Sequence, residues 1–458
     1  MRKIQKISDL QPTIGFTEFD IYNQYRHSFA SSELGGLYRS FPFSALAKEL
    51  GLQDQDSGRP SYFSPEGKIG LMVLKNYSGL SDKDLIAQLN ANLHYQLFCG
   101  VRINPLNPLD NFKIVSEIRC EIARKMDIDQ LQLILAAHWK PYLENPSVVF
   151  SDATRYESHL RFPTNEKLLF ESIDWIHNQL VNHCKSLKIR RPRNKFDDIA
   201  KRYQSFSKTR KKTLKKKYKL RRSLIYLLGK LCSQLTDLEK AHKSRLDLSG
   251  SYRKRRQVIL RVLEQQEQMQ QTRKSCPDRI VSIDKHYVRP IVRGKETKQV
   301  EFGAKANLIQ VDGINFIEHI DFKAFNEGTR GISCIQYAQS LMRKKVTHFA
   351  GDCIYATNKT RTYCSCRQSP IYTSFKPKGR PGKEEAERRL MRSMLSKERS
   401  TRLEGSFGTE KEHYNLRKIK ARTKETEILW IFFGIHTANA VRMIPKMERA
   451  LKEIKQSA

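Results

Sequence analysis

The sequence predicts an α+β protein with several domains: a helical N-terminal domain, a mixed sheet flanked by helices, and a basic helical insertion within that sheet. Three observations predict this fold class. Apolar residues recur at helical spacing over most of residues 64–143. After residue 276 the spacing between apolar residues falls towards two, which is typical of strands. Between a first strand near residue 150 and these later strands lies a long segment rich in lysine, arginine and leucine.

The charge of the chain indicates a polyanionic partner. Its 458 residues suffice for two or three domains, and a hydrophobic fraction of 39% is adequate for globular folding. Lysine and arginine number 84 against 48 aspartate and glutamate, which gives a formal net charge of +36. Such a surplus favours nucleic acid as the first candidate partner and a membrane surface as the second.

Neither membrane insertion nor secretion is predicted. The most apolar stretch, residues 428–435, is too short to cross a bilayer and predicts a buried core helix. The basic N-terminus has no apolar segment after it, so no secretory signal is indicated. Nine irregularly spaced cysteines favour reduced thiols in a cytoplasmic protein. Cys353, Cys364 and Cys366 with His348 form a weak zinc candidate, and packed or surface thiols are the favoured interpretation.

Residues 1–145 predict one mostly helical domain. One helix is predicted from Pro65 up to Gly79, and Ser81 is predicted to cap a second helix that runs through Leu93. Two helices joined by a short glycine-containing turn fit a helix-turn-helix, so this domain is a candidate for binding DNA ends. A plain helical hairpin without DNA contact gives the same pattern.

Residues 166–275 predict a basic helical insertion, in the form of a helical hairpin broken near residues 249–251. Within it, residues 188–222 hold seventeen lysines or arginines and two aspartates, which is typical of a phosphate-binding segment or of a solvated linker. Leucines at helical spacing over residues 224–238 predict a seam for a neighbouring helix. The candidate DNA contacts in the densest blocks are Arg210, Lys211, Lys212, Lys215, Lys216 and Lys217.

Two predicted strands end in an acid. Residues 147–154 predict a short buried strand with Asp152 at its tip, and residues 346–352 predict another that ends in Asp352. Between them a meander of three strands is predicted at 279–292, 298–309 and 314–322, with turns at Gly294 and at Asp312-Gly313, followed by a helix at 332–342. After Asp352, one-turn spacing predicts a helix that carries Tyr355, Asn358 and Arg361.

A third acid lies in a basic helical stretch, residues 400–411. Glu404 and Lys411 are seven residues apart, which places them on one side of a helix two turns apart. The surrounding cations indicate that an acid aimed into a pocket here would face a polyanion or a metal. Glu410 and Glu412 are predicted to be solvated, as most helical glutamates are.

Asp152, Asp352 and Glu404 therefore stand on three separate elements of a very basic chain. Carboxylates brought together in this way can hold two divalent metals about 4 Å apart, which activate a water or hydroxyl and stabilise the leaving oxygen of a phosphodiester. A strand meander followed by a further strand and flanking helices is the order expected of an RNase H-like fold.

These stretches resemble the DDE motif of bacterial insertion-sequence transposases. The resemblance covers roughly residues 60–445, including the helical region from Ser64 to Gly100 and the central strands from Asp278 to Gly303. Its most specific parts are Asp152-Ala153-Thr154, Gly351-Asp352 with Tyr355 and Asn358, and Glu404 with Lys411 after six intervening residues.

The resemblance implies roles for individual residues. Asp152, Asp352 and Glu404 would bind Mg²⁺, for which Mn²⁺ would substitute, and Lys411 would contact DNA phosphate. Further DNA contacts are assigned to Tyr355, Asn358 and Arg361. One departure from the motif concerns the arginine that usually precedes the glutamate by four residues, because Ser400 stands there and Arg399 and Arg402 are the candidates to replace it.

The implied protein is a transposase that cleaves DNA at terminal inverted repeats and joins the 3′ ends to target DNA. It would act as a homodimer in the bacterial cytoplasm, associated with the nucleoid. Its RNase H-like core would comprise residues 146–165 and 276–445, followed by a C-terminal tail, 446–458. Two other function classes stay open: a non-catalytic, domesticated DNA-binding protein, and a structure-specific nuclease on the same fold.

Overall fold

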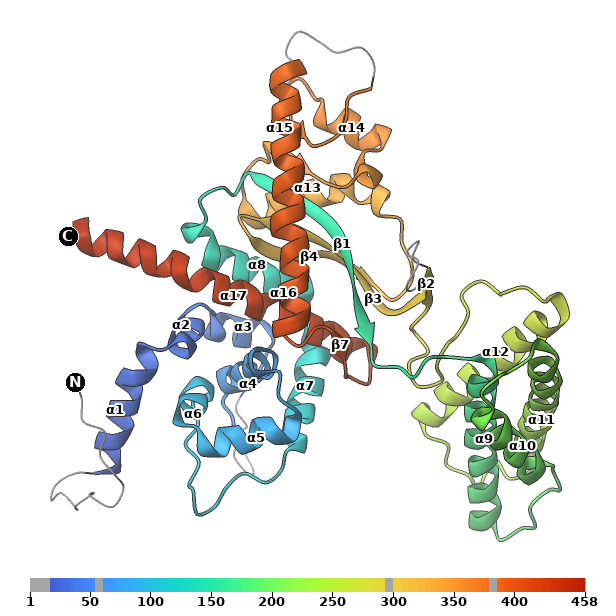
Figure 1. Ribbon diagram of the computed structural model, residues 1–458. Coiled ribbons are helices and arrows are strands. Elements are labelled where there is room, and N and C mark those ends of the chain that lie inside the picture. The colour runs from blue at the N-terminus through green and yellow to red at the C-terminus, as the bar shows by residue number, and fades with distance from the viewer. Residues whose placement is uncertain (1–16, 54–60, 293–299, 379–384, 458) are drawn as a thin grey trace.

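The computed structural model describes residues 17–53, 61–292, 300–378 and 385–457. A mixed sheet lies at the centre, helices from both ends of the chain cover it, and a group of helices stands to one side (Figure 1). This arrangement agrees with the predicted mixed sheet flanked by helices. The predicted turn at Gly294 lies outside the described residues.

The sheet is built around one long strand, β1 (Val148–Ser158). It pairs antiparallel with β3 (Val300–Val311) and parallel with β5 (His348–Ala350). Outside them lie β4 (Ile314–Asp321), antiparallel to β3, and β6 (Tyr372–Thr373), parallel to β5, so that the strand order is β4-β3-β1-β5-β6. Two short strands, β2 (Pro290–Val292) and β7 (Lys418–Ile419), pair with β3 and β1 respectively.

Strand β1 is longer than predicted. Its pairing with β3 continues from Val149 to Glu157, and Thr154, Tyr156 and Ser158 extend the alternation of buried side chains. Asp152 therefore lies in the middle of the strand, and its predicted place at the strand tip is wrong. The second half of the strand buries polar side chains such as Thr154 and Ser158 at every second position. The sequence shows no apolar alternation there, so it predicts an earlier end to the strand.

The strand predicted at residues 279–292 is also wrong for most of its length. Only Pro290–Val292 pairs in the sheet, although the alternation of apolar residues before it is real. Ile280 and Ile283 pack into the insertion, whereas Val281 and Val288 pack into the main core. A period of two arises here because the segment runs between two hydrophobic cores and contributes side chains to both.

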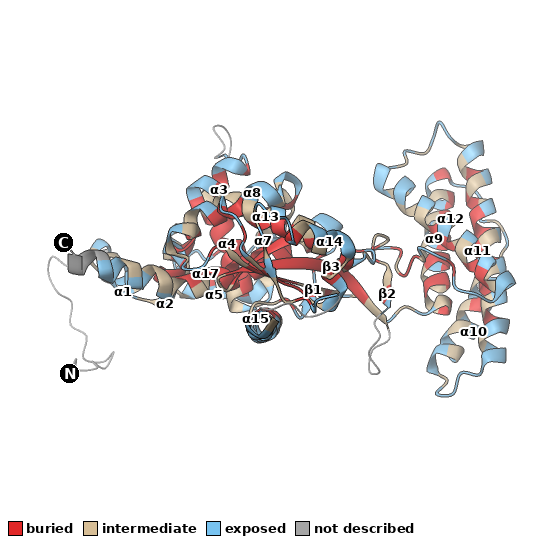
Figure 2. Cartoon of the chain, turned by 90° about the horizontal axis from the view of Figure 1, so that it is seen from above, coloured by how far each residue is buried: buried red, intermediate tan, exposed pale blue. Residues whose placement is uncertain are grey.

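Helices from the N-terminal part of the chain share one hydrophobic core with the sheet (Figure 2). Ser64 caps α4 by accepting a hydrogen bond from the Gly67 amide, and α4 is buried along most of its length. The predicted second helix ends at Ala91 because the Asn92 side chain accepts from the His94 amide and caps a new helix. The helices are α1 (Glu18–Ala30), α2 (Glu33–Arg39), α3 (Phe43–Glu49), α4 (Pro65–Ser78), α5 (Asp82–Ala91), α6 (Leu93–Cys99), α7 (Lys113–Lys125), α8 (Ile128–Trp139) and η2 (Lys140–Tyr142).

The insertion forms a hydrophobic cluster of its own (Figure 2). Instead of a hairpin it contains four helices: α9 (Asn165–Leu187), α10 (Phe196–Lys208), α11 (Leu214–Ala241) and α12 (Gly250–Thr272). The predicted break is present, since the Ser249 hydroxyl accepts from the Tyr252 amide and caps α12. The leucine seam on α11 is buried within this cluster and packs against neighbouring helices of the same chain.

The C-terminal third supplies the helices around the second half of the sheet. In order these are η3 (Glu327–Thr329), α13 (Gly331–Met342), η4 (Cys353–Tyr355), α14 (Asn358–Cys364), α15 (Glu385–Glu398), a π-helical turn η5 (Arg399–Glu404), α16 (Gly405–His413) and α17 (Lys424–Ser457). Because α17 continues to Ser457, no break separates the predicted tail, 446–458, from the core. By length and composition α17 could span a membrane, but 72% of its most apolar window is buried inside the protein, as expected of the predicted core helix.

A buried carboxylate anchors α16 to the sheet. Glu410 is fully buried, so the prediction that it is solvated is wrong, whereas Glu412 is exposed as predicted. The Tyr156 hydroxyl donates to Glu410 Oε2 at 3.0 Å, and the Asn315 amide donates to Oε1. Arg442 on α17 lies 3.8 Å from the same carboxylate. These partners satisfy an acid that burial would otherwise disfavour, and burial raises its pKa.

We expect the Glu410→Leu variant to lose about 3–5 kcal/mol of unfolding free energy, because the Tyr156 hydroxyl, the Asn315 amide and the Arg442 guanidinium all lose their common partner. Urea unfolding followed by circular dichroism measures this change. Glu412→Leu on the same helix is the control and should stay within about 0.5 kcal/mol of the wild type. Similar losses in both variants would contradict the anchoring role of Glu410.

Candidate functional site

The three predicted acids line one cavity. Phe150 of β1 pairs with Ala350 of β5, and Asp152 and Asp352 each lie two residues further along these parallel neighbours. The strand register therefore brings them to the same region of the sheet. Glu404, the last residue of η5, reaches the cavity from the helical side. Asp152, Asp352, Glu404 and Lys411 all belong to its lining.

A single arginine links two of these acids. Arg399 Nη1 lies 2.8 Å from Asp152 Oδ2, and its Nη2 lies 3.1 Å from Glu404 Oε1. The Arg399 and Asp152 side chains are 15% and 19% exposed, so this bridge is shielded from water, whereas the Glu404 side chain is half-exposed. A guanidinium can serve two carboxylates in this way because it carries several donors in one plane.

The π-helical turn explains why the arginine beside Glu404 is Arg399, five residues before it, and not the residue four before it as in the motif. In an α-helix the residue four before Glu404 would share its face, and that residue is Ser400. In a π turn the backbone hydrogen bonds join residues five apart and the turn is wider, so that Arg399 takes the place beside Glu404. Arg402 instead points away, is 56% exposed and pairs with Glu398 at 2.5 Å. Of the two sequence candidates, Arg399 is therefore the one that meets the acids.

The donor set matches a hard divalent cation in kind, since carboxylate oxygens are the ligands that Mg²⁺ prefers. Within the described ranges, however, no group of three or more histidine, cysteine, aspartate or glutamate side chains is close enough together to hold a metal ion. The Arg399 guanidinium occupies the place between Asp152 and Glu404 where a shared cation would lie. Metal binding by all three acids therefore requires Arg399 to move.

The cavity concentrates negative charge near Asp152. Burial raises the pKa of Asp152 to about 6, although the neighbouring Arg399 cation lowers it. The charges of Glu327 and Glu404 raise it further. A carboxyl group in this environment gains from an additional nearby cation.

Sequence reasoning missed an ion pair of this cavity. Glu327 of η3 lies in the lining, and Lys305 of β3 pairs with it at 2.6 Å. The Lys305 side chain also donates to the Phe325 carbonyl at 2.9 Å. Glu327 follows no strand-end pattern in the sequence, and only the packing of η3 against η4 brings it to the acids.

Lys411 lies on the same side as the acids, as its spacing predicted. Its Nζ donates to Thr154 Oγ1 at 2.8 Å, and it stands 5.7 Å from the centre of the Tyr156 ring. Lys411 is thereby held over β1, two residues beyond Asp152. Its ammonium group is placed to contact an anion that enters the cavity.

The helix predicted after Asp352 is interrupted, and this changes the role of Tyr355. The short turn η4 ends at Tyr355, which is fully buried and donates its hydroxyl hydrogen to Asn307. Tyr355 therefore packs inside the core, and its prediction as a DNA contact is corrected. Arg361 donates to the Ala356 and Lys376 carbonyls at 3.0 and 2.7 Å, while the exposed Asn358 accepts from Lys378.

The cationic blocks of the insertion lie at the turn between α10 and α11. Arg210, Lys211, Lys212, Lys215 and Lys216 are exposed, and Lys217 is half-buried. Lys215, Lys216 and Lys217 stand in the first turn of α11. This first turn contains no acid. Cations at a helix N-terminus oppose the helix dipole, so this arrangement is unfavourable unless an anion binds there.

The weak zinc candidate does not form a site in the described residues. All nine cysteines are free, with Cys364 buried and Cys353 and Cys366 exposed. His348 stacks on Tyr372 at a centroid distance of 5.3 Å. The favoured interpretation, packed or surface thiols, matches this arrangement.

Part of the chain matches a known protein family. Residues 26–119 match the family model described as "Transposase domain (DUF772)", which covers most of the N-terminal helices, about a fifth of the chain. A search of curated proteins and a search of solved structures gave no match. The matched segment contains none of Asp152, Asp352 and Glu404.

We expect the stability of the protein to depend on pH through Asp152. Its pKa of about 6 lies above the value of about 3.9 for an unfolded aspartate, so protonated Asp152 favours the folded state at low pH, and this contribution is lost as the pH rises through about 6. Relative to Asp152→Asn, the unfolding free energy of the wild type should fall between about pH 4 and pH 6 and level off above. Urea unfolding in a metal chelator measures it, and a difference that rises with pH would contradict the burial of Asp152.

Proposed function

From the match of residues 26–119 to a transposase domain, which supports a transposase of the insertion-sequence type, we propose that the whole chain is a DDE transposase. It binds the terminal inverted repeats of its element, cleaves DNA there and joins the 3′ ends to target DNA. Its core is an RNase H-like domain, in keeping with a meander followed by parallel strands and flanking helices. It acts on duplex DNA as a homodimer in the bacterial cytoplasm.

One observation carries this proposal: Asp152, Asp352 and Glu404, more than 250 positions apart along the chain from first to last, line a single cavity. The β1–β5 register supplies two of them, and the π turn supplies the third together with Arg399. Acids that converge in a chain of net charge +36 are suited to a metal-dependent reaction on a polyanion.

Asp152, Asp352 and Glu404 would hold Mg²⁺ or Mn²⁺ once Arg399 moves from between them. When bound, two such ions activate a nucleophilic oxygen and stabilise the leaving oxygen of a phosphodiester. Lys411, held over β1 by Thr154, binds a phosphate beside the scissile bond. Arg399 balances part of the charge of Asp152 and Glu404 and, once moved from between them, would be free to contact a DNA phosphate.

DNA outside the cavity is bound by two further regions in this proposal. The helical domain at residues 1–145, which includes the matched segment, recognises the ends of the element. The cations at the α10–α11 turn, Arg210 to Lys217, bind backbone phosphate, which relieves the unfavourable charge at the α11 N-terminus. The exposed Asn358 opens α14 four residues after Ile354 of the cavity lining and contacts DNA in this proposal, with Arg361 holding the segment behind it.

We expect Glu404→Gln to lower metal-dependent cleavage by more than about 100-fold, because even groups that only support metal ligands are worth 10–100-fold. DNA binding in a shift assay should persist, since the variant keeps its shape. The substrate is a duplex that carries the inverted repeats flanking the gene, and cleavage and strand-transfer products are measured separately. Glu412→Gln, an exposed acid on the next helix, is the control.

The outcomes of that assay separate the function classes. Cleavage without strand transfer by the wild type would favour a structure-specific nuclease, and binding without cleavage would favour a regulatory DNA-binding protein. Full activity in Glu404→Gln would remove Glu404 from the site.

We expect Arg399→Ala to reduce cleavage by about 10–100-fold, because Asp152 and Glu404 lose the group that holds them together before a metal binds. Arg399→Lys should recover only part of this activity, because one ammonium cannot bridge Asp152 and Glu404 as a guanidinium does. Arg402→Ala removes an exposed ion pair worth about 0–1 kcal/mol and should change the rate less than about fivefold. Equal losses in the Arg399 and Arg402 variants would contradict the assignment by the π turn.

A further inference from the structure

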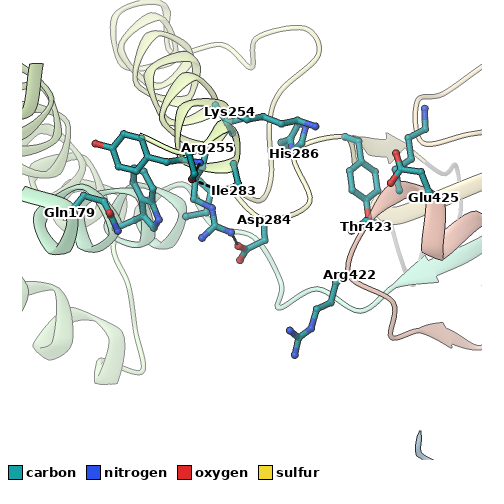
Figure 3. Close-up of a pocket in the computed structure, with 16 residues that line it drawn as sticks. Gln179, Lys254, Arg255, Ile283, Asp284, His286, Arg422, Thr423 and Glu425 are labelled. Carbon is teal, nitrogen blue, oxygen red and sulfur yellow. Dashed lines mark hydrogen bonds and ion pairs between the residues drawn. The ribbon is translucent and has the colours of Figure 1, made fainter. Parts of the chain in front are cut away.

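A cleft separates the insertion from the core on the side of α12 (Figure 3). It consists of two adjoining cavities of about 740 and 860 Å³, which share Arg255, Asp284, Arg422 and Thr423 in their linings. Lys254 and Arg255 of α12 approach it from one side, and Arg422 with Thr423 and Glu425 from the other (Figure 3). Neither cavity includes Asp152, Asp352 or Glu404.

Cations that form no ion pair dominate this cleft. Its acids include Asp284, which pairs with Arg255, and Glu171, which lies 3.9 Å from Lys167. Glu425 is a third acid of the lining. Among the residues that the structure describes, five lining cations have no such partner: Arg161, Lys254, Lys420, Arg422 and Lys424.

Cations of the cleft add to the effect of burial on two histidines of the lining. Burial lowers the pKa of His159, and the lysines at 418, 285 and 420 lower it further. Burial, Lys254 and Arg289 likewise lower the pKa of His286, against a smaller opposite effect of Glu425. An anion in the cleft would face cations from both walls.

The walls of the cleft are fixed to each other at its base. Lys285, in the segment that leaves the insertion, forms a buried ion pair with Glu427 of α17. The Ser158 hydroxyl, at the end of β1, donates to the same carboxylate at 2.5 Å. The strand that enters the insertion, the segment that leaves it and the core helix thus meet at one carboxylate, and the cleft is preformed.

Strands β1 and β7 connect the acid cavity to the cleft. Glu157 and Ser158 of β1 pair with Lys418 and Ile419 of β7, so β7 places its neighbours Arg417 and Lys420 along the far end of β1. Arg417 lines the acid cavity, and Lys420 lines the cleft. From Asp152 to Ser158 the strand covers six residues, or about 20 Å. A cationic track therefore leads from Lys411 past Arg417 to Lys420, Arg422 and Lys424.

We propose that this cleft binds the phosphate backbone of duplex DNA, about six base pairs from the phosphate held in the acid cavity, given a rise of about 3.4 Å for each base pair. This inference rests on the proposed function. Duplex DNA fits better than an acidic protein because the cations lie along a line that leads to the acids. The track also gives the insertion a role at its base, separate from the cations at the α10–α11 turn.

The test compares two double variants of the full chain. In Arg422→Ala/Lys424→Ala, two cations of the cleft are removed. In Lys344→Ala/Lys345→Ala, two exposed cations are removed near His348, which pairs with Val148 at the opposite end of β1, about 33 Å from Ser158. Binding of a fluorescein-labelled duplex of mixed sequence is titrated at several salt concentrations.

Each phosphate contact contributes about 0.9 to the slope of log affinity against log salt concentration, so the cleft variant should lose about 1.8 and the control variant almost nothing. Arg422→Gln/Lys424→Gln should behave like the alanine variant, and thermal unfolding verifies that each variant is folded. An unchanged slope in the cleft variants, or an equal loss in the control, would overturn the proposal. The proposed function fails separately, if the wild type shows no metal-dependent cleavage.

Discussion

The buried carboxylate of Glu410 fixes the geometry on which the candidate site depends. Through Tyr156, Asn315 and Arg442 it joins α16 to β1, to β4 and to α17. With α16 held in this way, the preceding π turn faces Asp152, and Lys411 lies over Thr154. A whole buried network of this kind could be replaced by packed apolar side chains at little cost, but while its donors are present Glu410 must meet all of them at once, which restricts α16 to one orientation.

The electrostatics of the protein have two opposite parts. The chain is strongly basic, yet six carboxylates line its central cavity, among them Asp152, Asp352, Glu404 and Glu327. The lining cations Arg155, Lys305, Lys411 and Arg417, together with Arg399, only partly balance them. Such a cavity is suited to a cation, whereas the basic surface of the chain is suited to a polyanion. The strand β1 connects the two parts, since it carries Asp152 in its middle and ends at the cationic cleft.

The insertion has a hydrophobic cluster of its own and contacts the core where the chain enters and leaves it. Its four helices bury their own leucines, while Lys285 and Ser158 meet Glu427 where the chain enters and leaves. The N-terminal helices differ, because they share the core of the sheet. The matched transposase segment is therefore packed together with the part of the protein that holds the acids.

The sequence alone determined the elements whose signals are local: the capped helix from Pro65, the turn before β4, the leucine seam, the acid after β5, and the spacing of Glu404 and Lys411. Only the tertiary structure decided which side chains are buried and with what partners. Glu410 and Tyr355 are polar residues whose partners lie on distant strands, so no local pattern predicts their burial. Arg399 replaces Ser400 beside Glu404 because the π turn contains one extra residue. The apolar side chains of residues 279–289 pack into two different cores and not onto the two faces of a sheet.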